Sequence, residues 1–143
     1  VHYDGVTREQ YMDRLVSQTE LILTNEPADI YANPTYLPED MQPDYDRYWT
    51  DERVDRVLDV LQRYDIALEI NARYRIPSFD IIRRARERGI RFTFGTNNVD
   101  ADFGRLEYCL EAVERCGLTA DDMWFPSMSV RRERPVVLYN RFD

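Results

Sequence analysis

Two short β-type segments that end in polar residues, each next to an amphipathic helical pattern, constrain the fold more than any other feature. The first is Asp65-Ile-Ala-Leu-Glu-Ile-Asn71 and the second is Arg91-Phe-Thr-Phe-Gly-Thr-Asn-Asn-Val99. Strands that alternate with helices are joined by right-handed crossovers, and they therefore lie parallel in one sheet. The carboxyl ends of such strands meet at one edge, which is where α/β barrels place their functional groups.

Local signals predict four helices and at least three strands. A capping-box spacing at Thr7-Arg-Glu-Gln10 and the pair Pro77-Ser78 are typical of helix starts, whereas Gly89 and Gly117 are typical of helix ends. We expect helices over residues 7–23, 50–64, 77–89 and 104–116, and strands over residues 28–32, 66–70 and 90–94. Residues 136–139 form either a last strand or a segment that docks on the sheet.

The predicted α/β alternation amounts to half of a (β/α) barrel. We interpret residues 1–143 as a single domain, with a long polar loop over 33–48 and a C-terminal tail over 127–143. Loops of this length are usually functional or mobile. An open half-barrel exposes two sheet edges that normally need cover, so we expect a larger assembly or a homodimer formed through those edges.

Composition narrows the classes of partner. A net charge of −8 repels phosphate backbones, which argues against nucleic acid. All 19 basic residues are Arg, so these residues contain no Schiff-base lysine but do offer bidentate donors for phosphate or carboxylate. No apolar run approaches the ~20 residues of a membrane span and no signal peptide is evident, so we expect a cytoplasmic protein without a membrane partner. The first residue, Val1, is not Met, which leaves a missing upstream segment open.

The two cysteines do not form an intrahelical disulfide. Cys109 and Cys116 lie seven residues apart on one predicted helix, or ~10.5 Å apart at a rise of ~1.5 Å per residue. This separation exceeds the ~7 Å limit between the Cα atoms of a disulfide. We therefore expect free, buried thiols, and the single His argues against a zinc site.

Four segments, in order and spacing, resemble the second half of a PHP (polymerase and histidinol phosphatase) domain. They are Val1-His2-Tyr-Asp-Gly5, Asp29-Ile-Tyr-Ala-Asn-Pro34, Leu68-Glu-Ile-Asn71 and Gly95-Thr-Asn-Asn-Val99. That family comprises metal-dependent phosphoesterases with distorted (β/α) barrels and two or three metal ions at the carboxyl ends of the strands. The resemblance implies that residues 1 to about 126 form the C-terminal half of such a TIM-like barrel.

The resemblance also implies which metal ligands are kept and which are replaced. His2 keeps a ligand position, whereas Asn33, Asn97 and Val99 stand where the family has His, Asp and His. An Asn oxygen is a weak, neutral ligand, and Val has no donor atom. No cofactor is therefore expected from this chain alone. Mn, Zn or Mg would be needed if an upstream half supplied the family's His-x-His motif.

Polar residues near the predicted strand ends are the candidate ligand pocket: Asn33, Glu69, Asn71, Arg73, Asn97, Asn98 and Asp100. Glu69 and Asn71 alternate on a strand and therefore face the same way. The alternative for this pair is structural, with Asn71 capping a turn and Glu69 pairing with an arginine. Arg73, together with Arg75, either binds an anion or lies in a solvated loop.

Three further candidates follow the last predicted strand. Asn97 and Asn98 either line the pocket or simply turn the chain. Asp100 could belong to a shifted Mg or Ca site, but it could also, with Asp102, cap the helix that begins near Phe103. Five aromatic residues crowd the 33–48 loop and either stack on a ring-bearing ligand or pack the loop onto the barrel: Tyr31, Tyr36, Tyr45, Tyr48 and Trp49.

Three functions are compatible with these patterns. The first is a degenerate PHP-like domain that acts as a binding or scaffold module, with a small anionic ligand near Asn33, Asn71 and Asn97. The second is a metal-dependent phosphoesterase that becomes complete when an upstream half is present. The third is an interaction domain that pairs with another chain through its exposed sheet edges.

Overall fold

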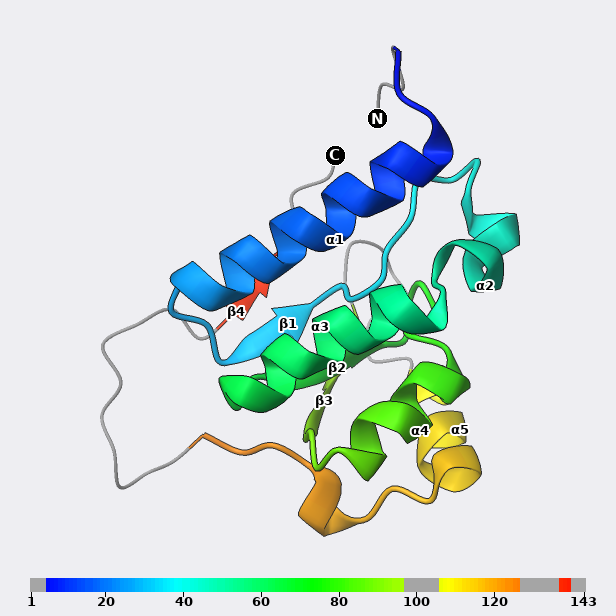
Figure 1. Cartoon of the computed structure of the whole chain (residues 1–143). Coiled ribbons are helices and arrows are strands. Elements are labelled where there is room, and N and C mark those ends of the chain that lie inside the picture. The colour runs from blue at the N-terminus through cyan, green and yellow to red at the C-terminus, as the bar shows by residue number, and fades with distance from the viewer. Residues whose placement is uncertain (1–4, 97–105, 127–136, 140–143) are drawn as a thin grey trace.

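The computed structural model describes residues 5–96, 106–126 and 137–139 (Figure 1). It contains a four-stranded sheet in the order β3-β2-β1-β4, in which every neighbouring pair is parallel. The strands are β1 (Ile30–Ala32), β2 (Ala67–Asn71), β3 (Phe92–Gly95) and β4 (Val137–Tyr139). The predicted α/β class and parallel strands are confirmed. The last segment is a strand, and it lies beside β1.

Five α-helices lie within the described residues: α1 (Arg8–Asn25), α2 (Tyr45–Tyr48), α3 (Asp51–Arg63), α4 (Phe79–Glu87) and α5 (Glu107–Cys116). Thr7 caps α1 in a complete capping box, and the Thr50 and Ser78 side chains cap α3 and α4. Gly117 ends α5 in the left-handed conformation with φ 66°. None of the described helices is long and apolar enough to span a bilayer.

The start of α5 differs from the prediction. The helix begins at Glu107, with Leu106 at the N-cap position and no side-chain cap. Neither Asp100 nor Asp102, the proposed capping residues, is the N-cap residue of α5 as described. Both also lie outside the described residues.

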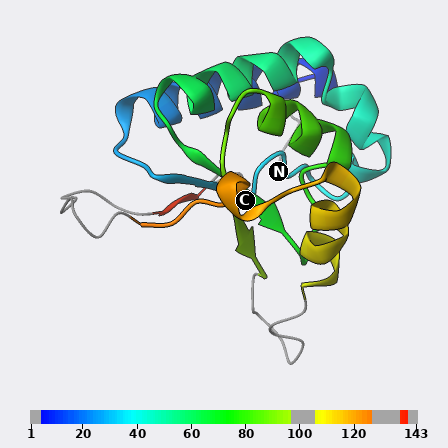
Figure 2. The ribbon, with the colours of Figure 1, turned by 90° about the horizontal axis from the view of Figure 1, so that it is seen from below.

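The main helices cover one face of the sheet. Strand order advances steadily from β1 to β2 to β3, so right-handed crossovers place α3 and α4 on the same face. Figure 2 shows α1, α3 and α4 together on that face, and α1 packs beside α3. The core lies between these helices and the sheet and includes Leu58, Leu61 and Leu68. Alternation along β2 then turns Glu69 and Asn71 away from the helices.

The two edges of the described sheet are β3 and β4, so within these residues the sheet does not close into a barrel. The segment after α5 touches the β3 edge at one point. Met123 forms an isolated parallel bridge with Phe92, and the Trp124 N–H donates to the Phe92 carbonyl at 2.8 Å. This contact covers part of the β3 edge.

The segment predicted as a polar loop over residues 33–48 contains helical structure instead. A 3₁₀ helix, η1 (Gln42–Asp44), leads directly into α2 (Tyr45–Tyr48). Leu37 and Met41 are buried in the core. Such short helices have little intrinsic stability and form because tertiary packing supports them, which is why the proline-rich sequence of this segment did not reveal them.

Both cysteines are free and buried, as predicted. The Cys109 thiol donates to the Ile70 carbonyl at 3.3 Å and so ties α5 to β2. Burial raises the pKa of Cys109 to about 11, despite two backbone hydrogen bonds that lower it. The thiol is therefore protonated at neutral pH, and a structural role in packing is indicated.

Candidate functional site

Three of the predicted pocket residues meet at the carboxyl edge of the sheet. The Asn71 side-chain amide donates to Asn33 Oδ1 at 2.9 Å and to Glu69 Oε1 at 3.0 Å. The same Glu69 oxygen accepts the backbone N–H of Asn33 at 3.0 Å. We call Asn33, Glu69 and Asn71 the polar cluster. Its assembly follows from the parallel sheet, because the ends of β1 and β2 are neighbours.

Asn71 holds the turn that follows β2. It is fully buried, and its Oδ1 accepts the Tyr74 N–H at 3.0 Å. Its backbone also exchanges two hydrogen bonds with Ile76, at 2.7 and 3.3 Å, which closes the turn over residues 72–75. The alternative in which Asn71 caps a turn is therefore confirmed.

Glu69 lies flat against the neighbouring strand. A Cβ atom added at Gly95 would lie 2.3 Å from Glu69 Oε2, so only glycine leaves room for this carboxylate. The carboxylate is bonded to Asn33 and Asn71, and the expected pairing with an arginine is replaced by these bonds. Its negative charge opposes the binding of an anion within the polar cluster.

The loop after β1 is held in a strained conformation. Thr35 has φ 64°, which is unusual for a β-branched residue and costs about 1–3 kcal/mol. Its N–H donates to Tyr31 Oη at 3.3 Å, and its carbonyl accepts from Trp49 Nε1 at 2.9 Å. Its hydroxyl lies 2.6 Å from Tyr45 Oη. Tyr31 and Trp49 therefore hold the Thr35 backbone, and Tyr45 holds its side chain, next to Tyr36.

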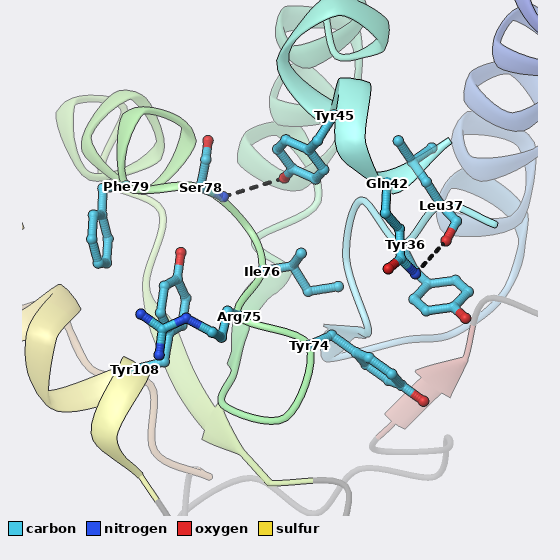
Figure 3. Close-up of a pocket in the computed structure, with 10 residues that line it drawn as sticks. All are labelled: Tyr36, Leu37, Gln42, Tyr45, Tyr74, Arg75, Ile76, Ser78, Phe79 and Tyr108. Atoms are coloured by element: carbon cyan, nitrogen blue, oxygen red, sulfur yellow. Dashed lines mark hydrogen bonds between the residues drawn. The ribbon is translucent and has the colours of Figure 1, made fainter. Parts of the chain in front are cut away.

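A pocket of about 320 Å³ lies between the turn after β2, the segment that precedes and begins α2, and α5 (Figure 3). We call it the carboxyl-end pocket. Its ten lining residues are Tyr36, Leu37, Gln42, Tyr45, Tyr74, Arg75, Ile76, Ser78, Phe79 and Tyr108. Half of them are aromatic, and they come from segments that are far apart in the sequence.

Aromatic pairs form two sides of the pocket. Tyr36 and Tyr74 meet edge to face with ring centroids 4.9 Å apart, and Phe79 and Tyr108 stack with centroids 5.0 Å apart. Figure 3 shows the buried Ile76 between Tyr74 and Tyr108. Paired rings of this kind stabilise each other, so they form a well-ordered apolar surface.

The hydroxyl groups of two pocket tyrosines are bound to the protein. Tyr45 Oη accepts the Ser78 N–H at 3.2 Å, and the Tyr108 hydroxyl donates to the Pro77 carbonyl. Burial raises the pKa of both Tyr45 and Tyr108 well above the ordinary value, so both side chains stay neutral. These bonds hold the two rings in place and leave ring surface to line the pocket.

Arg75 is the one charged residue among the ten that line the pocket. Its guanidinium carbon lies 4.9 Å from the centre of the Tyr108 ring, a cation–π distance. Arg75 Nη2 also lies 3.4 Å from Glu111 Oε2 on α5. The Arg75 and Glu111 side chains are 56% and 41% exposed, so water screens this ion pair.

No family model, curated protein or solved structure matches this chain. The geometry of the polar cluster and the carboxyl-end pocket is therefore the basis for a functional hypothesis.

The remaining predicted site residues are not brought into this site by the described structure. Arg73 is exposed, with its guanidinium 5.8 Å from the Tyr74 ring centre, and does not line the pocket. His2, Asn97, Asn98 and Asp100 lie outside the described residues. In the described ranges, no group of three or more His, Cys, Asp or Glu side chains is arranged so that it could hold a metal ion.

The aromatic residues in and beside the 33–48 segment fall into two groups. Tyr31, Tyr48 and Trp49 are buried and pack the segment onto the core, whereas Tyr36 and Tyr45 line the pocket. Sequence reasoning missed Tyr74 and Tyr108, which lie on other elements. The one available signal was Arg75, which was grouped with Arg73 as a possible anion contact.

Proposed function

We propose that this chain is a ligand-binding domain that takes a small ring-bearing molecule into the carboxyl-end pocket. The main observation in support of this proposal is a pocket of about 320 Å³ at the carboxyl ends of parallel strands, lined by five aromatic rings. Open parallel sheets bind ligands at this edge, and ligand pockets typically combine apolar walls with a few polar groups. The volume is near the lower end of the usual range and suits one or two fused rings.

The proposed ancestry is a degenerate PHP-like half-barrel. Two observations support it: α3 and α4 cover one face of a parallel sheet, and the polar cluster lies at the carboxyl edge. Asn33 stands where the resemblance implies a metal-binding His, and its side-chain oxygen accepts a hydrogen bond from Asn71. A neutral amide bonded within the protein supports binding rather than metal-dependent hydrolysis.

Replacing Tyr74 with Ala is expected to weaken ligand binding at least fivefold, because it removes one aromatic side of the pocket. The probe is the neutral bicyclic compound naphthalene-2-carboxamide, titrated into the 143-residue chain by isothermal titration calorimetry. Tyr64→Ala is the matched control, since Tyr64 is similarly exposed, at 45% against 40% for Tyr74, but lies outside the pocket.

Equal losses of affinity in Tyr74→Ala and Tyr64→Ala would contradict the proposal, as would the absence of any binding by the unmodified chain. Circular dichroism of both variants checks that each exposed substitution leaves the fold intact. Binding that is lost in Tyr74→Ala alone supports the carboxyl-end pocket as the ligand site.

A metal-dependent phosphoesterase, completed by an upstream half, is the second candidate. It is favoured by the convergence of the Asn33, Glu69 and Gly95 segments at one sheet edge, where the resemblance implies a metal centre. Protein expressed from the complete gene can be loaded with Mn and Zn, dialysed and analysed by plasma mass spectrometry. Two or more retained ions per chain would favour this candidate over the binding domain.

An interaction domain remains a weaker proposal. It is supported by the β3 edge, where Trp124 makes the one backbone bond described, and by the exposed rings of Phe94 and Phe125 nearby in the sequence. Light scattering over a concentration series tests it. A metal-independent dimer would support pairing through the sheet edges.

A further inference from the structure

The residues that line the carboxyl-end pocket also indicate the charge of its ligand. We infer that it takes a planar aromatic ring bearing a carboxylate or phosphate group, with Arg75 as the partner of that anion. This inference rests on the proposed binding function and names the ligand class. Its elements are the paired aromatic walls, the single charged lining residue and the weak ion pair that this residue makes with Glu111.

The walls favour a flat ring. Tyr74 and Tyr108 lie on either side of the buried Ile76, which also lines the pocket (Figure 3). Ring edges and faces line the space, because the hydroxyls of Tyr45 and Tyr108 are bonded to the protein. An aromatic ligand gains offset-stacked or edge-to-face contacts that a saturated ring of equal size does not gain.

The charge of the lining favours an anion. A cage built only of aromatic rings attracts cations. Here, however, Arg75 places a positive charge in the wall, and no Asp or Glu is among the ten lining residues. The nearest described carboxylate to this guanidinium, that of Glu111, is already paired with it. An arginine fork can bind either a carboxylate or a phosphate through two parallel hydrogen bonds.

Glu111 competes with the ligand for Arg75. Arg75 Nη2 lies 3.4 and 3.5 Å from the two Glu111 oxygens, which are long distances for a charged hydrogen bond. Both side chains are more than one third exposed, so the pair is weakened by solvent. A ligand anion can therefore replace Glu111 at little cost. Removal of the Glu111 charge should strengthen anion binding.

The test compares naphthalene-2-carboxylate with the neutral naphthalene-2-carboxamide on the 143-residue chain by calorimetry. We expect the carboxylate to bind about tenfold more tightly. Arg75→Gln should reduce the carboxylate to the affinity of the carboxamide, whereas Glu111→Gln should tighten the carboxylate twofold to threefold and leave the carboxamide unchanged. Gln is unbranched at Cβ, as Arg is, so it suits the left-handed backbone at Arg75 (φ 54°).

Arg73→Gln is the matched control, since Arg73 lies on the same turn but outside the pocket lining, and it should not change either affinity. Phenyl phosphate compared with benzoate assigns the preferred anion, and benzyltrimethylammonium tests the cation cage. Equal affinity for carboxylate and carboxamide, tighter binding of the cation, or an unchanged carboxylate affinity in Arg75→Gln would overturn the inference. If the carboxamide binds and the carboxylate binds no more tightly, the proposed binding function stands and only the anion preference is overturned. If neither naphthalene probe binds, both the binding function and the anion preference are overturned.

Discussion

Replacing Asn71 with Asp is expected to destabilise the protein by about 3–5 kcal/mol at pH 7, because it breaks a buried network and buries a second carboxylate. The Asn71 amide nitrogen lies 3.0 Å from Glu69 Oε1 and 2.9 Å from Asn33 Oδ1. An oxygen at this position would face two acceptor oxygens. Two carboxylates at this separation repel each other by roughly 5 kcal/mol at an effective dielectric constant of about 20.

This penalty depends on pH. Burial and the Glu69 charge raise the pKa of the introduced carboxyl group in the folded state above the unfolded value of about 3.9. Well below pH 4 the group is protonated in both states, and the difference from the unmodified protein is smallest. As the pH rises further, the unfolded state ionises first and stability is lost until the folded-state pKa is reached. Urea unfolding of both proteins between pH 4 and pH 8 measures the difference.

The variant Asn71→Leu separates the effect of the added charge on stability from the effect of the lost hydrogen bonds. It leaves the Tyr74 N–H and the acceptors on Asn33 and Glu69 without the Asn71 partner, at about 1–3 kcal/mol for each unsatisfied buried group. It introduces no titratable group, so its penalty should follow pH far less steeply than that of Asn71→Asp. A pH-independent penalty for Asn71→Asp, or one below about 1 kcal/mol, would contradict the described polar cluster.

Replacing Gly95 with Ala should cost about 2–4 kcal/mol, through its effect on Glu69. The new Cβ would lie 2.3 Å from Glu69 Oε2 and 2.5 Å from its carboxyl carbon, so the carboxylate must move. Its hydrogen bonds from Asn33 and Asn71 are then lost. Gly95 does not have a positive φ, so alanine is compatible with the backbone and would otherwise stabilise a strand by roughly 0.5–1 kcal/mol.

A double-mutant cycle with Glu69→Ala isolates this contact. Once the Glu69 side chain is removed, Gly95→Ala has nothing to displace, so the double variant should be no less stable than Glu69→Ala alone. The expected coupling energy is therefore at least about 2–4 kcal/mol, measured by urea unfolding followed by circular dichroism. Additive effects of the two substitutions would show that Glu69 does not lie against β3.

The helices were predictable because their signals are local. Thr7, Thr50 and Ser78 each cap a helix where the sequence indicated a start, and Gly117 ends α5 in the left-handed conformation that glycine accepts readily. The helical turns over residues 42–48 were missed, since their support comes from distant core residues. The place of β4 beside β1 was also missed, because long-range pairing leaves no local pattern.

The candidate site was predictable only in part. The polar cluster followed from two facts that a sequence can supply, namely parallel strands and alternation along β2. The carboxyl-end pocket did not follow, because its walls come from Tyr36, Tyr74 and Tyr108, which lie on three separate elements. Arg73 and Arg75 looked equivalent in the sequence. The structure distinguishes them, because Arg75, at φ 54°, lines the pocket and Arg73 does not.

The most direct test of ligand binding at the carboxyl-end pocket is a map of backbone amide shifts. The ¹⁵N-labelled chain is titrated with naphthalene-2-carboxylate and followed by two-dimensional ¹H–¹⁵N NMR. The proposed site predicts the largest shifts at Tyr36, Ser78 and the turn over residues 74–76, with smaller changes at Asn33 and Gly95. Shifts that are absent, spread over the surface, or centred on Asn33 and Gly95 would contradict it.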